Sequence, residues 1–459
     1  MENTHIDPAL RRVLAGAAKR LYFIGICGIS MSGLAVMAKR HGWEVAGCDR
    51  APSCAAAHAL FRLGISVEAE ETPHPEDADL FVYTTAVRED SPAVCYARER
   101  GLPLFSRADF LATLMEESPT RVAVAGMHGK STTVGMLSAI LTAGGLDPTV
   151  SCGAALTPGG SAWRIGSHDV FLAEACEYRD AFLALSPTLA VITNIDLDHP
   201  DWFPDLGAVK SSFLAFLAKS EKAVIGADCV ALRDMTPARA VTFGYHASAL
   251  YRGEDTPDGL TVSRSDEPLG TIPLALPGRY NRENALAAVA AATELGLPFD
   301  IVRDALATFR GIGRRMETIG HLRGATVVLD YAHHPTEMAA SLSAAAEKRQ
   351  GGGRVLCIFQ PHTYTRTAAL WEDFTTALGL ADRTLLLDIY AAREEPLPGI
   401  TGKRLAAAAG ADYAPDFAGA ARWAIENVRP GDLLLIMGAG DIDRLPGLLP
   451  LDKEPSGET

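Results

Sequence analysis

The sequence predicts an α/β protein of three domains, because three features of the chain agree. Its 459 residues exceed what a single hydrophobic core usually serves. A strand, a glycine-bearing turn and a helix follow one another near the start, and the same order begins again at residue 121. After residue 315 a third series of alternating strand and helix patterns begins.

The first domain is expected over residues 1–118. The apolar run 21–26 (LYFIGI) is followed by a glycine-bearing turn, a helical pattern and a second strand over 43–48, which ends at Asp49. An acidic residue at the end of the second strand is typical of a Rossmann-like nucleotide-binding unit. Further strands are expected at 80–84 and 103–105.

The second and third domains are expected over residues 119–313 and 314–459. In the second, the strand RVAVAG leads through GMHGKS into a helix, so we expect a central ATPase domain with a P-loop and a mostly parallel sheet. Its other strands are expected at 169–173 and 189–193, with a β-rich region over 241–275. The third domain is again expected to be Rossmann-like, with strands at 325–330, 354–359, 384–389 and 432–437.

Bulk properties exclude several classes of protein. A formal net charge of -14 argues against a nucleic-acid coat, which needs a basic face. The eight cysteines form no C-x-x-C pair, as is typical of reduced thiols. The first twenty residues show no signal-like apolar core, and no run approaches the ~18 apolar residues of a membrane span. We therefore expect a cytoplasmic protein with neither a membrane nor a nucleic acid as partner.

The stretch AVAGMHGKSTT resembles a phosphate-binding loop on a shortened frame. The pattern G-x-x-x-x-G-K-[ST] requires glycine at position 124, where this chain has Val124. Lys130 is expected to reach the terminal phosphates of a nucleotide, and the Ser131 hydroxyl to ligate Mg²⁺. The alternative is a plain tight turn with a surface lysine.

Oxygen-bearing side chains follow two further strands. Glu174 ends the strand in FLAEACEY, and VITNIDLDH places Asp196, Asp198 and His199 directly after another, next to Asn194. Since the carboxyl ends of parallel strands form the ligand crevice of such folds, these residues are candidate metal ligands. Taken singly, each acidic residue is more often a solvated loop charge, and a loop histidine can cap a turn.

The first glycine turn, GICGISMSG, supports nicotinamide binding only weakly. Cys27 and Ser30 stand where G-x-G-x-x-G requires its second and third glycines. An NAD-dependent dehydrogenase therefore remains an alternative from a different class. What the turn retains is the ability to take a diphosphate.

Nine motifs in order resemble those of the Mur ligase family over about residues 21–443. They are GICGISMSG, GMHGKSTT, EACEY, TNIDLDH, PGRYNRENAL, GIGRRME, DYAHHPTE, FQPHTYTRT and GDLLLIMGAGDI. The resemblance implies an ATP-dependent ligase of peptidoglycan synthesis that joins L-alanine to the lactyl carboxylate of UDP-N-acetylmuramate through an acyl phosphate. A ligase that attaches a whole tripeptide to the same UDP-sugar is the alternative within the family. The implied partners are small-molecule substrates, in a monomer or homodimer.

The resemblance also implies roles for particular residues, with Lys130, Glu174 and His199 as the catalytic set. Residues expected to bind ATP are Gly126, Met127, His128, Gly129, Lys130, Ser131, Thr132, Asn281 and Arg314, with Arg315 as the alternative to Arg314. Ser131 and Glu174 would hold one Mg²⁺ and His199 a second, with Mn²⁺ as a possible substitute. Tyr331, His333 and Arg366 would frame the alanine. The UDP-sugar would lie against Gly25, Gly28, Ser32, Gly33, Asp49, Thr84, Thr85 and Ala86.

The chain departs from the family pattern at two motifs. Thr363 stands where many relatives carry an arginine, and EACEYRD replaces a common E-A-D-E-S-D. A carbamoylated lysine occurs in several such ligases, and Lys210 is the nearest candidate here, although its spacing from His199 is short. A catalytically silent nucleotide-binding regulator would lack the metal ligands, which this chain keeps. Lys130→Met is expected to abolish product formation in a chain that still folds.

Overall fold

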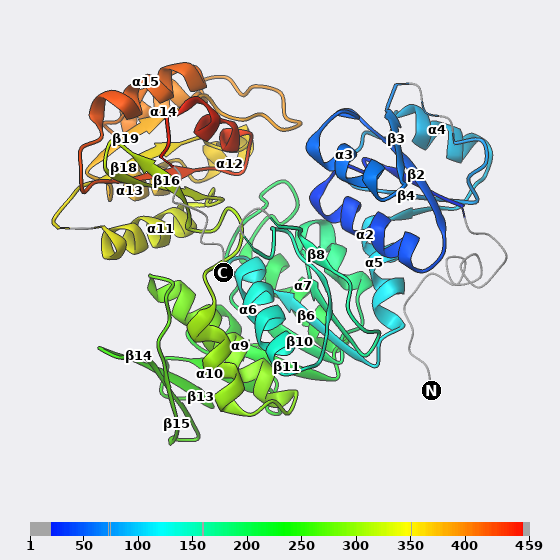
Figure 1. Ribbon diagram of the computed structural model, residues 1–459, viewed down its shortest axis with the longest axis horizontal. Helices are drawn as coiled ribbons and strands as arrows, with labels where there is room; N and C mark the ends of the chain where they lie inside the picture. Colours follow the sequence, from blue (N-terminus) through cyan, green and yellow to red (C-terminus); the bar gives the residue numbers. More distant parts are fainter. Residues whose placement is uncertain (1–19, 72, 74, 158–159, 350, 453–459) are drawn as a thin grey trace.

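The computed structural model describes residues 20–452 except 72, 74, 158–159 and 350. The first 19 residues, which include most of the segment searched for a signal, lie outside this description. Three α/β units are present, each with its own sheet. The first unit (blue) and the third (yellow to red) lie above the middle unit (cyan to green) in Figure 1. The predicted three-domain α/β architecture is confirmed.

The first unit is a parallel five-stranded sheet of order β3-β2-β1-β4-β5, the order of a mononucleotide-binding half. Its elements are β1 (Arg20–Ile24), α2 (Ile29–Arg40), β2 (Glu44–Asp49), α3 (Ala55–Arg62), β3 (Ser66–Ala69), β4 (Leu80–Tyr83), α4 (Pro92–Glu99), β5 (Leu104–Ser106) and α5 (Arg107–Glu116). The four strands expected from apolar runs are present. Strand β3, with the mixed sequence SVEA, gave no such signal.

The middle unit has a ten-stranded sheet of order β15-β14-β13-β12-β11-β10-β6-β9-β7-β8. Strands β12 to β9 in this order pair in parallel, whereas β13-β14-β15 and β7-β8 pair antiparallel at the two edges. The elements are β6 (Thr120–Ala125), α6 (Lys130–Ala143), β7 (Thr149–Ser151), β8 (Trp163–Arg164), β9 (Val170–Glu174), η1 (Tyr178–Ala184), β10 (Leu189–Ile192), α7 (Leu206–Ala218), β11 (Lys222–Gly226), α8 (Val230–Arg233), β12 (Val241–Gly244), β13 (Tyr251–Thr256), β14 (Gly259–Arg264), β15 (Glu267–Ile272), α9 (Arg279–Glu294) and α10 (Phe299–Thr308). The phosphate loop lies between β6 and α6 at the centre of this sheet.

The third unit has a six-stranded sheet of order β16-β17-β21-β18-β19-β20, parallel except for the β16-β17 pair. The elements are β16 (Glu317–Leu322), β17 (Ala325–Asp330), α11 (Pro335–Lys348), β18 (Val355–Phe359), α12 (Tyr364–Ala369), α13 (Trp371–Leu378), β19 (Arg383–Leu386), α14 (Gly402–Ala408), β20 (Asp412–Tyr413), α15 (Phe417–Asn427), β21 (Leu433–Met437) and η2 (Ile442–Leu448). All four strands expected from the sequence are present, joined by β16 and the two-residue β20.

The start of α11 is fixed by a capping box whose residues also belong to the candidate site. His334 is the N-cap, and its Nδ1 accepts a hydrogen bond from the Thr336 N-H at 3.3 Å. Glu337 at the third helical position accepts in return from the backbone N-H groups of His333 and His334. Pro335 occupies the first turn, where its missing N-H costs nothing.

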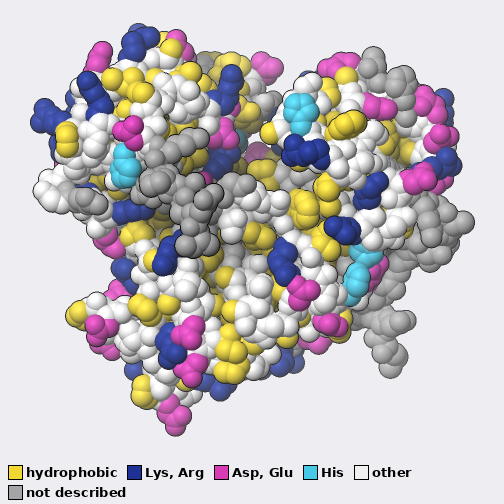
Figure 2. Space-filling model, viewed as in Figure 1, with side chains coloured by type: hydrophobic (Ala, Val, Ile, Leu, Met, Phe, Trp, Pro, Cys, Tyr) yellow, Lys and Arg dark blue, Asp and Glu magenta, His cyan; other side chains and the backbone are white. Residues whose placement is uncertain are grey.

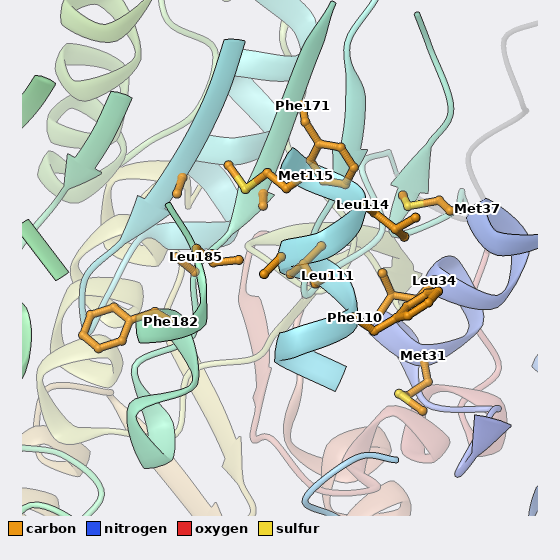
Figure 3. Close-up of a cluster of buried hydrophobic side chains, with 14 of the residues drawn as sticks. Met31, Leu34, Met37, Phe110, Leu111, Leu114, Met115, Phe171, Phe182 and Leu185 are labelled. Carbon is orange, nitrogen blue, oxygen red and sulfur yellow. The ribbon is translucent and has the colours of Figure 1, made fainter. Parts of the chain in front are cut away.

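The first and middle units share one continuous apolar core. Helix α5 lies between them and packs on both sides (Figure 3). The labelled side chains are Met31, Leu34 and Met37 from α2, Phe110, Leu111, Leu114 and Met115 from α5, and Phe171, Phe182 and Leu185 from the middle unit. The orientation of the first unit on the middle unit is therefore set by burial of apolar surface. The two main clusters of the third unit instead consist of residues 316–449.

No helix among the described residues combines the length and the apolar character needed to cross a bilayer.

Replacing Phe110 by alanine is expected to lower the free energy of unfolding by about 3–5 kcal/mol. Its ring is fully buried and packs edge-on against Phe23 at 5.5 Å between centroids, with Trp43 beside it. Urea unfolding followed by tryptophan fluorescence measures the change. Phe61→Ala, at a side chain 74% exposed on α3, is the matched control and should shift the stability by no more than about 0.5 kcal/mol. Equal effects of the two variants would contradict the shared core.

Candidate active site between the middle and third units

The phosphate loop depends on two glycines with left-handed backbone conformations. Gly126 has φ 140° and Gly129, the N-cap of α6, has φ 84°. A β-carbon at Gly126 would overlap the Thr193 hydroxyl, and one at Gly129 would overlap the Asn284 side-chain oxygen. Both positions therefore require glycine for conformation and for space.

Hydrogen bonds hold the phosphate loop against the segment that follows β10. The N-H groups of Met127 and His128 donate to the backbone and side-chain oxygens of Asn194, at 3.1 and 2.9 Å. The Asn194 amide and the Thr193 hydroxyl both donate to the His128 carbonyl. Asn194, a candidate metal ligand from the sequence, thus shapes the loop. The first N-H groups of α6 take no part in these hydrogen bonds, and they lie at the helix end that favours anions.

Lys130 is held inside the site by a carboxylate that the sequence analysis did not single out. Its Nζ donates to the Gly126 and Met127 carbonyls at 2.6 and 3.0 Å and lies 3.0 Å from Glu177 Oε2. The Glu177 side chain is 3% exposed, and its other oxygen lies 3.5 Å from His199 Nε2. Glu177 therefore joins the predicted catalytic residues Lys130 and His199.

Burial and pairing act in opposite directions on this buried pair. Burial acts to raise the pKa of Glu177, but the charge of Lys130 and the His199 contact outweigh it and lower the pKa. Burial likewise acts to lower the pKa of Lys130, and the neighbouring Glu177 raises it. Both groups are therefore charged at neutral pH, and each one compensates the buried charge of the other.

Glu174 and Ser131 face each other as expected of residues that share a cation. The Ser131 hydroxyl donates to Glu174 Oε2 at 2.8 Å, and the Gly153 N-H donates to the same oxygen at 2.7 Å. Cys152 Sγ lies 3.5 Å away. These convergent oxygens fit a hard divalent cation, since rotation of the hydroxyl would offer a lone pair. His199 contacts Glu177 rather than this pair.

The segments that carry Glu177 and His199 have strained backbone. Arg179, Asp180 and His199 have φ of 53°, 57° and 54°, in the left-handed region that non-glycine residues rarely adopt. The His199 ring lies against Tyr178 with centroids 4.7 Å apart. Such strain persists where surrounding contacts over-determine the conformation, as at functional sites.

The third unit reaches the phosphate loop through Glu337. Its Oε1 lies 3.2 Å from His128 Nδ1 and 3.7 Å from the Arg315 guanidinium. On the other side of the His128 ring, Nε2 lies 3.6 Å from Asp196, which also accepts from the Thr336 hydroxyl at 3.1 Å. A single loop histidine thus stands between carboxylates of two units.

A second contact between the units is the buried pair of Asp198 and Arg366. Nε and Nη2 of Arg366 both lie 2.9 Å from Asp198 Oδ1, and both side chains are less than a tenth exposed. Burial acts to raise the pKa of Asp198, but Arg366 and the nearby histidines hold it well below its usual value. The guanidinium expected to bind an amino-acid carboxylate therefore faces Asp198.

A cavity of ≈ 370 Å³ lies between the two units, lined by residues of both. Of the residues predicted to bind ATP, His128, Gly129 and Thr132 line it. Asn284 also lines it, and its buried Nδ2 has no hydrogen-bond partner in the described part of the chain. Asn281 donates instead to the Pro277 carbonyl at 2.7 Å. An orphaned amide donor in a cavity beside a phosphate loop fits a nucleotide base.

Arg314 and Arg315, the two alternatives for contact with the nucleotide, have different surroundings. Arg315 lines the cavity, whereas Arg314 pairs with Asp443 at 3.0 Å and lies 3.4 Å from the Gly438 and Gly440 carbonyls. Both guanidinium groups lie over the Tyr331 ring, at 4.9 and 5.1 Å from its centroid.

The predicted alanine-binding residues are clustered in the third unit. Tyr331 and His333 meet edge-on with ring centroids 5.4 Å apart, and His362 lies between His333 and Arg366. Burial lowers the pKa of His333 to about 4 and that of His362 to about 3. Both rings are therefore neutral at neutral pH and do not repel an ammonium group.

The first unit has its own hollow of ≈ 540 Å³ above the glycine turn. The predicted residues that line it are Gly25, Gly28, Asp49, Thr84 and Ala86. Asp49 accepts hydrogen bonds from the Cys27 and Ala51 N-H groups, so it also braces the turn. Arg107 lines the hollow as well, and its guanidinium donates to the Ser30 hydroxyl at 3.1 Å.

Three predicted sugar-site residues have other surroundings. The Ser32 hydroxyl donates to the Ile29 carbonyl within α2. A β-carbon at Gly33 would meet Trp163 of the middle unit at 2.8 Å, so this glycine permits close packing between units. The Thr85 carbonyl accepts from Arg393 of the third unit at 2.9 Å, which brings all three units into contact.

Removal of the Lys130 charge is expected to destabilise the chain as well as the reaction. Lys130→Met leaves the Glu177 carboxylate buried without its cation, which should cost about 3–5 kcal/mol in free energy of unfolding. The double variant Lys130→Met/Glu177→Gln should recover most of this loss while product formation stays abolished. Urea unfolding of the three proteins measures it, and equal stability of single and double variants would contradict the pairing.

The stability conferred by His128 is expected to disappear in alkaline solution. Burial acts to lower the pKa of His128, but the hydrogen bonds to Asp196 and Glu337 outweigh it and raise the pKa to about 9. A folded pKa above the unfolded value of about 6.5 gives stability that is complete below pH 6.5 and is lost as the pH rises through 9. The melting temperature of ligand-free wild type should therefore exceed that of His128→Gln near pH 6.5 and converge with it above pH 9. A constant difference would contradict this assignment.

Family models match the chain in three consecutive segments. They describe a Mur ligase family catalytic domain over residues 20–118, a Mur ligase middle domain over 124–292, and a Mur ligase glutamate ligase domain over 314–440.

Full-length relatives and solved structures agree with the three segments. A UDP-N-acetylmuramate--L-alanine ligase of Anaeromyxobacter sp. (strain Fw109-5) is 41% identical over 447 residues, which are 92% of this chain and 95% of the relative. One of Acetivibrio thermocellus is 39% identical over 95% of this chain and 96% of its own. The UDP-N-acetylmuramate-alanine ligase of Thermotoga maritima superposes with a TM-score of 0.79 at 27% identity, covering 93% and 97% of the two chains. A murein peptide ligase of Psychrobacter arcticus gives 0.72 at 26% identity, covering 94% and 98%.

These matches agree with the shortened phosphate loop, the carboxylates around it and the third unit docked on them. The chain therefore belongs to the Mur ligase family.

Proposed function

We propose that this chain is an ATP-dependent ligase that joins L-alanine to the lactyl carboxylate of UDP-N-acetylmuramate in peptidoglycan synthesis. The observation that carries the proposal is the cavity between the middle and third units, where the phosphate loop meets the DYAHHPTE segment. The full-length likeness to relatives with this activity supports the choice of substrate. The cytoplasmic location and the choice between monomer and homodimer remain predictions.

We propose that the phosphates of ATP lie at the start of α6, with the base between Asn284 and the segment after β11. The Lys130 ammonium donates to two loop carbonyls and pairs with Glu177, so all three of its N-H groups are engaged, and one of these contacts must break when it donates to a phosphate. Ser131 and Glu174 would hold Mg²⁺, which supplies charge neutralisation between the phosphates when bound. His199 and Glu177 flank the same region from the strained loops.

The reaction class follows from what the chain can position. The lactyl carboxylate attacks the γ-phosphorus, ADP leaves, and the amine of alanine then displaces phosphate from the acyl phosphate. The chain holds the reacting groups close together and keeps water from the acyl phosphate. His333 and His362 are neutral, so the Arg366 guanidinium is the cation beside them that can pair with the alanine carboxylate. To do so, it must give up part of its contact with Asp198.

We further propose domain bounds of 1–118, 119–313 and 314–459. Helix α5 ends at Glu116 and β6 begins at Thr120, whereas β16 begins at Glu317 after the strained hinge residues Arg314 and Met316. The UDP-sugar is assigned to the hollow of the first unit beside Arg107.

The test of the function is ADP release with UDP-N-acetylmuramate and a panel of co-substrates. We expect turnover with L-alanine and little with L-alanyl-γ-D-glutamyl-meso-diaminopimelate. Preference for the tripeptide would favour the alternative ligase of the family. Reduction of NAD without ATP turnover would instead support the dehydrogenase alternative.

Arg315→Gln is expected to weaken binding of Mg·ATP by about ten-fold or more, equivalent to about 1.4 kcal/mol. Its guanidinium lines the cavity, whereas that of Arg314 faces Asp443. Calorimetry with a non-hydrolysable ATP analogue measures the affinity, and Arg314→Gln is the matched control with an expected change below about two-fold. The reverse order would return the nucleotide contact to Arg314.

A further inference from the structure

A second group of potential metal ligands lies on the surface where the first unit meets the middle unit. His41 follows α2, Glu117 follows α5, and His168 precedes β9. One ligand atom from each of the three lies within 4.8 Å of the others. Figure 2 shows histidine and acidic side chains side by side on the surface in the region where the two units meet. Nothing in the proposed reaction uses these residues.

The spacing of the ligand atoms suits a tetrahedral site. His41 Nδ1 lies 3.4 Å from Glu117 Oε2. Metal bonds of 2.0–2.1 Å in a tetrahedron place neighbouring ligand atoms about 3.3 Å apart. The His41 and His168 ring centroids lie 5.4 Å apart. Two imidazoles and one carboxylate form a ligand set that selects Zn²⁺, Co²⁺ or Ni²⁺ over Mg²⁺.

Each histidine is held in place by the fold. His41 stacks on Trp43 with centroids 5.5 Å apart and an angle of 24° between the rings. The loop that carries His168 is fixed on both sides, because the Ser167 N-H donates to Asp147 and the Asp169 carbonyl accepts from Thr120. Neither His168 nitrogen has a hydrogen-bond partner among the described residues. A preorganised imidazole with a free lone pair is what a metal requires.

The surrounding electrostatics also favour a cation. Helices α2 and α5 both end at this point, so the negative ends of two helix dipoles converge on it. A hollow of ≈ 200 Å³ beside the imidazoles leaves room for a water as fourth ligand. Arg40 lines the same hollow and opposes a cation, but its side chain is exposed, so solvent screens its charge.

We propose that His41, Glu117 and His168 bind one Zn²⁺-class ion, which links the first unit to the middle unit. The ligands come from both sides of the boundary near residue 118, so the ion would act as a cross-link over the shared apolar core. This site is separate from the candidate active site. Its occupation would stabilise the relative orientation of the two units.

The test is Zn²⁺ binding to the full-length chain after treatment with chelator, measured by competition with a chromogenic chelator in excess Mg²⁺. His41→Gln, Glu117→Gln and His168→Gln should each lose one bound Zn²⁺ or bind it about ten-fold or more weakly. His58→Gln, at an exposed histidine of α3, is the matched control and should bind as the wild type does. The group His128, Asp196 and His334 is intact in all four variants, so any Zn²⁺ bound there cancels in the comparison.

Co²⁺ gives an independent readout. The visible absorption of tetrahedral Co²⁺ should appear in wild type and in His58→Gln and be reduced in His168→Gln. Zn²⁺ should also raise the melting temperature of wild type more than that of His168→Gln. His168 lies in an exposed loop, so this variant should fold even if His41→Gln disturbs Trp43. Unchanged Zn²⁺ stoichiometry and affinity in His168→Gln would overturn the proposal.

Discussion

The candidate site depends on buried charge pairs that cross the boundary between the middle and third units. The buried Asp198 pairs with Arg366 of the third unit, and the nearly buried Glu337 contacts His128 of the middle unit as well as Arg315 of its own unit. A buried carboxylate without a partner is costly, so these pairs form only when the third unit is docked. Docking in turn brings Arg315 and α11 against the phosphate loop and closes the cavity.

The two boundaries of the molecule are therefore physically different. Opening near residue 118 would expose the apolar side chains around α5, whereas opening near residue 313 would break mainly polar contacts that substrate groups can replace. Of these two domain boundaries, the one near residue 313 is therefore the one at which domain closure costs least. The strained backbone at Arg314 and Met316 lies at that hinge.

Much of the fold could be predicted because its central strands are continuous apolar runs, as in parallel sheets covered on both faces. Strands such as β3 lack that signal, since half-exposed edge strands follow no simple pattern. The site was harder to predict, because the spacing of residues along the chain does not show in which direction their side chains point. Asn281 and Asn284 share a helix face by spacing, yet only Asn284 reaches the cavity, and Arg314 and Arg315 diverge because the backbone turns left-handed at Arg314. Glu177 lies in an irregular loop, where no sequence periodicity indicates the position of a side chain.

The most direct test of this account is a double-mutant cycle on Asp198 and Arg366 in the ligand-free chain. The free energy of unfolding is measured for wild type, Asp198→Asn, Arg366→Gln and the double variant. If the pair docks the third unit, each single variant leaves a buried charge unpaired, and the double variant should be more stable than the sum of the single losses by at least about 1 kcal/mol. Additive losses would contradict the claim that this buried pair holds the units together.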